Sequence, residues 1–177
     1  RGRVLGTNHT DYLITLGNLG IILGLRGNLA EAERVVRDVI DRRTRAGLGN
    51  TTDTFANIGN LGIILLASDR PDEAERLISP AWQRATQLFG TNNPMNTLRI
   101  QHLLARIFAE RGKLPEAEKL AAEGLAIQAR VASGPETIAR TLLILGRVKM
   151  QQGHPDEAGP FLRKALDLAR EQLPSRR

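Results

Sequence analysis

Apolar residues recur along the chain at steps of three and four positions, in stretches separated by polar turns that contain glycine. In the first stretch this spacing places one set of side chains on a single helix face: Leu13, Leu16, Leu19, Gly20 and Leu23. After the turn at residues 26–28, a second stretch follows the same rule with Ala32, Val35, Val36, Val39 and Ile40. The pattern predicts two amphipathic helices joined by a tight turn, each of about 16 residues.

This helix pair is repeated along the chain. The seven residues GNLGIIL occupy positions 17–23 and occur again at 59–65. The turn segment that begins at Gly27 has counterparts that begin at Asp69, Gly112 and Gly153, so the steps are 42, 43 and 41 residues. A fixed period in this range is the signature of a stacked-repeat array.

The sequence therefore predicts an all-α fold, a right-handed α-solenoid of four helix-turn-helix repeats with eight antiparallel helices. The repeats span approximately residues 6–47, 48–88, 89–131 and 132–173, in a single domain over residues 1–177. Because the chain does not begin with Met, we expect it to be part of a longer protein.

Small residues recur at two sites of every repeat. The first helices carry Gly20, Gly62, Ala105 and Gly146, and the second helices carry Ala32, Ala74, Ala117 and Ala158. Helices reach the short end of the 8–10 Å interaxial range only where side chains are small. We expect these sites to face each other inside each repeat.

Local signals at turns and helix ends agree with this reading. Gly27 supplies the left-handed turn between helices, and Asp69 takes that place in the second repeat. Oxygens of Thr10 or Asp11, and of Thr52 or Asp53, are expected to cap first helices. Interior prolines at 80 and 160 are expected to bend second helices.

The repeat resembles the tetratricopeptide repeat (TPR), in its 42-residue kinesin-light-chain form, over the full chain. The resemblance rests on Leu-Gly in the first helix, Gly at the turn and Ala in the second helix. It implies that first helices line a concave groove that binds an extended peptide. In that groove Asn18 and Asn60 would hydrogen-bond the peptide backbone, next to Ile21 and Ile63. The alternative role for both asparagines is hydrogen bonding between neighbouring helices.

The same groove-facing positions become basic in the last two repeats. They hold Arg99, His102, Arg106, Arg140, Leu143 and Arg147. Guanidinium groups suit carboxylates and phosphates, so we expect an acidic peptide as partner, with a phosphate-bearing ligand as the rival. For each arginine alone, a solvated or salt-bridged side chain is the alternative.

The amino-acid composition excludes some kinds of chemistry for this chain. The net charge is +6, with 21 Arg against 4 Lys, and there is no Cys, so disulfides and thiolate metal sites are excluded. The three histidines lie in different repeats without metal-ligand spacing, and no phosphate-binding glycine-rich motif is present. We expect no enzyme activity, no cofactor, no metal, no membrane span and a cytoplasmic location.

Three functions remain open. The first is a protein-protein interaction module for an acidic peptide, and the second is a ligand-sensing regulatory segment of a larger signalling ATPase or transcription regulator. A nucleic-acid-binding helical array is least favoured, because the groove has almost no aromatic residues for base stacking. The last helix keeps apolar residues such as Leu162 and Leu166, so we also expect further repeats or self-association through the terminal helices.

Overall fold

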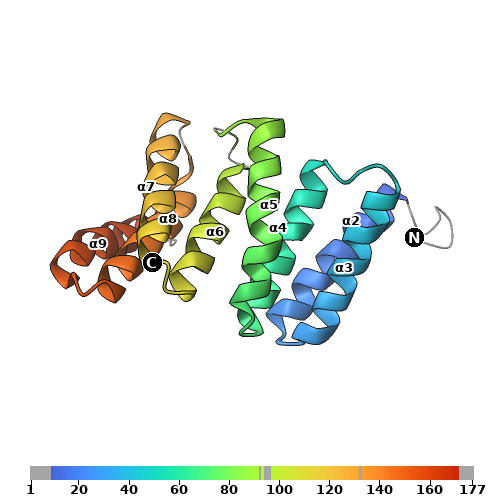
Figure 1. Cartoon of the computed structure of the whole chain (residues 1–177), viewed down its shortest axis with the longest axis horizontal. Coiled ribbons are helices and arrows are strands. Elements are labelled where there is room, and N and C mark those ends of the chain that lie inside the picture. Colours follow the sequence, from blue (N-terminus) through green and yellow to red (C-terminus); the bar gives the residue numbers. More distant parts are fainter. Residues whose placement is uncertain (1–8, 92, 94–96, 132, 172–177) are drawn as a thin grey trace, which may run out of the picture. The chain divides into compact units, whose positions relative to one another are not determined.

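The computed structural model describes residues 9–91, 93, 97–131 and 133–171, and these residues form eight α-helices and no strand (Figure 1). The helices are α2 (Thr10–Leu25), α3 (Leu29–Arg45), α4 (Thr52–Ala67), α5 (Pro71–Phe89), α6 (Arg99–Glu110), α7 (Leu114–Arg130), α8 (Pro135–Gln151) and α9 (Pro155–Glu171). The prediction of an all-α fold built from four helix pairs is confirmed. None of the described helices is both long and apolar enough to span a membrane.

The chain divides into two compact units, residues 1–88 and 89–177. Each unit contains two of the predicted repeats. In the first unit α3 packs against α2 and α4, and α2 contacts α4. In the second unit α7 packs against α6 and α8, α8 packs against α9, and α6 contacts α8. The first helices of consecutive repeats therefore lie side by side within each unit.

The turns inside the repeats have the predicted left-handed backbone. Gly27 has φ +79°, and Asp69 has φ +57°, the only positive φ at a non-glycine position among the described residues. At the first turn, Asn28 N–H donates to the carbonyl of Leu23 over 3.0 Å, which satisfies a carbonyl at the end of α2. The chain can therefore reverse direction within three residues, and the second helix returns along the first.

The small residues are buried where the two helices of a repeat meet. A Cβ atom at Gly20 of α2 would overlap Cγ2 of Val36 and would lie 3.6 Å from the carbonyl oxygen of Ala32 on α3. Gly146 of α8 has the same place against Ala158 of α9, whose carbonyl oxygen would lie 3.6 Å from the added atom. The second-helix alanines are completely buried: Ala32, Ala74, Ala117 and Ala158. The predicted close contact is confirmed in the first and fourth repeats.

Helix starts differ from the sequence prediction by one residue. The side chain of His9 caps α2 by accepting from the amide of Asp11 over 3.2 Å, and Thr51 caps α4 by accepting from Thr54. The residue before each predicted cap takes the extended backbone that a capping residue needs. α5 and α9 continue past Pro80 and Pro160, and the bend expected at each proline stays a prediction.

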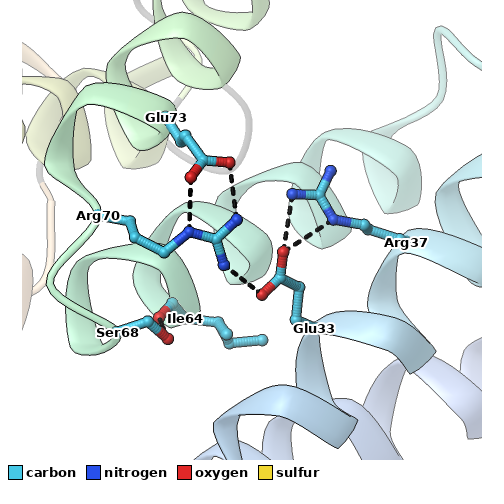
Figure 2. A network of polar contacts seen from close by, with 6 residues as sticks. All are labelled: Glu33, Arg37, Ile64, Ser68, Arg70 and Glu73. Carbon is cyan, nitrogen blue, oxygen red and sulfur yellow. Dashed lines mark hydrogen bonds and ion pairs between the residues drawn. The ribbon is translucent and has the colours of Figure 1, made fainter.

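An ion-pair network on the second helices links consecutive repeats of the first unit (Figure 2). Glu33 of α3 accepts from Arg37 over 2.8 Å and from Arg70, just before α5, over 2.6 Å. Arg70 also donates to both carboxylate oxygens of Glu73, over 2.6 and 2.7 Å. These hydrogen bonds lower the pKa of Glu33, and the one from Arg70 contributes most.

The second unit has a similar link at the equivalent glutamate. Glu118 of α7 accepts from Lys149 Nζ over 2.8 Å and from Gln152 over 2.9 Å, and Lys149 also pairs with Glu157 over 2.7 Å. Each link ties the second helix of one repeat to the turn or helix end of the next. Pairs of this partly exposed kind add modestly to stability and fix the orientation of neighbouring helices.

We predict that Gly20→Ala destabilises the first unit by about 2 kcal/mol, because the new methyl group overlaps Val36 in a packed contact. The matched control is Gly59→Ala on α4, where no atom lies within 4 Å of the added Cβ. That control is expected to raise stability by about 0.5 to 1 kcal/mol, since glycine is the poorer helix former. Urea denaturation of both variants measures the difference, and equal effects would contradict the close-contact assignment.

Candidate functional site

The residues that the sequence assigns to partner binding all lie on first helices. In the first unit, Asn18 and Ile21 are on α2, and Asn60 and Ile63 are on α4; we call these four residues the neutral face. In the second unit six residues form what we call the basic face, with Arg99, His102 and Arg106 on α6, and Arg140, Leu143 and Arg147 on α8. Contact between α2 and α4, and between α6 and α8, brings equivalent positions next to each other within each unit.

The neutral face exposes large apolar side chains. Ile21 is 40% exposed and Ile63 is 45% exposed, although both stand in the middle of a helix that packs in the array. Asn18 is exposed, whereas Asn60 is half-buried and interacts with another group of the protein. Two exposed isoleucines at equivalent positions of neighbouring helices, with a polar amide beside them, form a surface able to bind an extended chain.

Buried polar residues below this face were missed by the sequence analysis. Asn57 of α4 donates from Nδ2 to the carbonyl of Asp53 over 2.8 Å, and its Oδ1 would lie 2.7 Å from a Cβ at Gly17. The guanidinium of Arg43, whose side chain is 2% exposed, pairs with Asp53 over 3.1 Å. Arg43 lies four residues after Val39, on the same apolar face of α3. This spacing in the sequence could have predicted that Arg43 is buried.

The basic face contains two carboxylates that the sequence analysis did not include. Arg147 pairs with Glu110 of α6 over 2.8 Å, and Arg140 pairs with Glu136 of α8 over 2.6 Å. Both pairs are largely exposed, so water and salt screen them and each contributes little to stability.

Arg99 and Arg140 lie close enough to influence each other. Desolvation by neighbouring side chains, and then the positive charge of Arg140, lower the pKa of Arg99, although part of its side chain reaches solvent. Like charges held together in this way repel, and an anion bound between them would relieve the repulsion.

His102 belongs to a buried polar cluster that connects three helices. Its Nε2 lies 2.7 Å from Oγ1 of Thr141 on α8 and 2.5 Å from Nε2 of Gln128 on α7. Because the Gln128 amide nitrogen can only donate, His102 Nε2 accepts, and we assign the ring proton to Nδ1 from this network. Gln128 also donates to Thr141 over 2.9 Å, and both residues are completely buried.

Burial keeps His102 neutral. Desolvation first, and then the charge of Arg140, lower the pKa of His102 from 6.5 to about 4. The ring packs against α7 at Gly124, where an added Cβ would lie at an ordinary contact distance of 3.6 Å from both Cδ2 and Nε2. His102 therefore acts at neutral pH as an uncharged hydrogen-bonding residue within the basic face.

The described residues offer no metal centre, since they contain no group of three or more His, Asp or Glu side chains that could hold an ion. His9 caps α2, and His154 lies near Glu157, 4.0 Å away, in the turn before α9. The candidate site presents exposed apolar side chains, amides and guanidinium groups.

A comparison with known protein families agrees with the helical repeats described above. A family model described as the MalT-like TPR region matches residues 6–175. The chain belongs to the MalT-like TPR family. The resemblance to tetratricopeptide repeats that the sequence analysis stated is confirmed, and TPR arrays are in general protein-binding scaffolds without catalytic activity. No curated protein sequence gives a significant match to the chain.

Solved structures similar to this MalT-like TPR chain include light-chain-type repeat proteins. The crystal structure of BtubC (BKLC) from P. vanneervenii has a TM-score of 0.77 at 17% identity and covers 94% of this chain and 67% of that chain. The putative kinesin light chain with nearly identical TPR-like repeats from Podosopora anserina has a TM-score of 0.77 at 22% identity, covering 94% and 79%. A point variant of that protein has a TM-score of 0.76 at 22% identity, covering 92% and 77%. These likenesses concern the fold.

The lowered pKa of His102 predicts a specific dependence of stability on pH. Between about pH 6.5 and pH 4 the unfolded chain binds a proton on this ring and the folded chain does not, so stability falls as the pH falls. From pH 7 to pH 5 the loss is expected to be about 2 kcal/mol.

The control for this prediction is His102→Gln, which keeps a hydrogen-bonding side chain and removes the titration. Urea denaturation of both proteins is measured at the two pH values. The carboxylates titrate in both proteins, so the difference between them reports the contribution of the histidine. The same pH dependence in the two proteins would show that His102 is not held neutral by the fold.

Proposed function

We propose that this MalT-like TPR chain is a protein-protein interaction module that binds an extended, acidic peptide or partner segment on its first helices. The observation that carries the proposal is the repetition of binding-type residues at equivalent, solvent-facing positions. Arg99 and Arg106 on α6 recur as Arg140 and Arg147 on α8. Leu143, between the last two, is 52% exposed.

The neutral and basic faces supply different parts of such recognition. Exposed isoleucines and asparagines of the neutral face suit the apolar side chains and the backbone of an extended segment. Guanidinium groups of the basic face suit its carboxylates, and complementary charge chiefly raises the rate and specificity of association. The ion pairs with Glu110 and Glu136 do not prevent this, because a guanidinium has five N–H donors and can donate to a second carboxylate.

A second candidate is a ligand-sensing regulatory segment of a larger signalling ATPase or transcription regulator. It is supported by the match to the MalT-like TPR region over residues 6–175. In that role the same faces would bind the ligand or partner, and binding would change the activity of domains outside this sequence. We propose no catalytic step for this chain in either role, and a cytoplasmic location goes with both.

The basic face is tested by a variant in which Arg99, Arg106, Arg140 and Arg147 are all changed to Gln. Four exposed charge pairs at about 0.3 to 0.4 kcal/mol each predict roughly tenfold weaker binding of an acidic peptide. Fluorescence anisotropy with acidic and basic peptides of equal length measures the effect at low and high salt.

The matched control changes the same number of charges on the second helices of the same unit, at Lys119, Arg130, Arg163 and Lys164. This control is expected to keep the affinity for the acidic peptide within about twofold. Equal losses of affinity in the two variants would mean that net charge alone explains the effect, and this would contradict the proposed face.

Competition by inorganic phosphate would favour the phosphate-bearing ligand, and tight, steeply salt-dependent binding of single-stranded RNA would favour a nucleic-acid function.

The role of Asn18 is tested separately by Asn18→Ala. If this exposed amide bonds the peptide backbone, the variant binds the peptide about 5- to 10-fold more weakly, with unchanged stability. If it bonds a neighbouring helix instead, urea denaturation shows a loss of about 1 kcal/mol and the affinity is unchanged. The second outcome would remove Asn18 from the proposed site.

A further inference from the structure

The basic face contains two pairs of arginines with different surroundings. Arg99 and Arg140 stand at equivalent positions of α6 and α8, and we call them the first pair. Arg106 and Arg147 stand seven residues further along the same helices, and we call them the second pair. All four side chains reach solvent, so both pairs are accessible to a partner.

The second pair already has a carboxylate that bridges the two helices. Glu110 of α6 reaches across to Arg147 of α8, with an N–O distance of 2.8 Å. At the first pair, Arg140 pairs over 2.6 Å with Glu136, which lies four residues earlier on the same helix. Both of those side chains are mostly in water, with exposed fractions of 69% and 74%. The ion pair at Arg140 therefore stays within α8, whereas the ion pair at Arg147 crosses from one helix to the other.

A hydrogen bond between α6 and α8 holds the first pair in place. Nε2 of His102 lies 2.7 Å from Oγ1 of Thr141. Arg99 precedes His102 by three residues, about one turn of α6, and Arg140 is next to Thr141 in the sequence. Gln128 of α7 is completely buried and donates to Thr141 over 2.9 Å, which fixes the cluster on a third helix. The first pair therefore extends from backbone positions that are set before a partner binds, and such preorganisation favours binding.

The surroundings of the first pair are unfavourable for positive charge. Desolvation first, and then the charge of Arg140, lower the pKa of Arg99, and the other contacts of Arg99 do not reverse this balance. The charge of Arg140 also contributes, after desolvation, to the lowered pKa of His102. An anion next to both guanidinium groups would offset their repulsion, at a place where part of the water has already been removed.

We propose that one carboxylate of the partner binds between Arg99 and Arg140, with one oxygen directed to each guanidinium. This site depends on the proposed function, since the carboxylate belongs to the acidic partner. A planar carboxylate suits two guanidinium groups, because each of them offers N–H donors in a fixed plane. Arg140 keeps donors for it beside Glu136. Arg106 and Arg147 contribute mainly to the rate of association, as exposed charges do.

Two double variants of the full 177-residue chain test this site. Arg99→Gln with Arg140→Gln removes the first pair. Arg106→Gln with Arg147→Gln is the matched control, because it removes the same charge from the same two helices. The probe is a labelled peptide of alternating glutamate and glycine with an amidated C-terminus, and fluorescence anisotropy measures its affinity.

The first-pair variant is expected to bind this peptide at least about fivefold more weakly, since it loses charge-assisted hydrogen bonds in partly desolvated surroundings. The control is expected to bind about twofold more weakly at most. A second peptide, of alternating glutamine and glycine with a free C-terminus, has its only carboxylate at the end. Loss of its binding in the first-pair variant would identify a C-terminal carboxylate as the ligand, and loss confined to the glutamate peptide would identify a side chain.

Sodium acetate tests the site without a peptide. Heteronuclear NMR signals of the arginine Nε–H groups, assigned with the variants, are followed against a sodium chloride titration at equal ionic strength. Acetate is expected to shift the signals of Arg99 and Arg140 several-fold more than those of Arg106 and Arg147. Larger shifts of the first pair with inorganic phosphate than with acetate would assign the site to phosphate and overturn the carboxylate.

The results separate this site from the proposed function. A wild type that binds the glutamate peptide, with equal losses of affinity in the two variants, would overturn the first-pair site and leave the interaction function intact. A wild type that binds neither peptide would contradict the function, and the acetate titration would then decide the site alone. Equal shifts of all four arginine signals with acetate, or no shifts, would overturn the site. Circular dichroism confirms that the variants are folded.

Discussion

Close contact between the two helices of each repeat is the constraint on which the rest of the structure depends. Gly20 fits against Val36 and the backbone at Ala32 because it has no side chain, and Gly146 fits against Ala158 in the same way. Larger side chains at these points would push the helices apart and expose the leucines, isoleucines and valines between them to water. Burial of each such side chain is worth about 1.5 to 3 kcal/mol, so the short interaxial distance decides the stability of the core.

Since the core is made by small and aliphatic residues, polar residues can specify how one repeat packs against the next. Each unit has one buried polar side chain near the end of a second helix, Arg43 on α3 and Gln128 on α7, at equivalent positions of the repeat. Arg43 pairs with Asp53 of the next repeat, and Gln128 bonds Thr141 of the next repeat. Buried groups of this kind are costly when unpaired, so Gln128 favours the packing in which it meets Thr141. Arg43 has the ion pair with Asp53, but its buried Nε makes no hydrogen bond.

The same repetition separates the packing side of a first helix from its exposed side. Within each unit, one side of α4 or α8 packs against the preceding repeat, and another side carries Asn60 and Ile63 or Arg140 and Arg147. The position of Ile21 stays exposed at its equivalents Ile63, Arg106 and Arg147. Ile64 of α4 and Val148 of α8 are both buried, and in each case a repeat of the same unit precedes the helix. Exposure that recurs with the period thus marks the face that we propose for binding.

The sequence by itself determined the helices, their pairing and the residues at the closest contacts. These features depend on spacing within about 40 residues, and periodicity of apolar and small residues reports it directly. Only the tertiary structure decided which polar side chains meet. His102 and Thr141 are 39 residues apart, and Arg147 and Glu110 are 37 apart, on different repeats. Their contacts depend on how one repeat is rotated and displaced on the next, and a repeat pattern does not contain that geometry. The neutral state of His102 has the same origin, since its pKa depends on burial by helices that are distant in sequence.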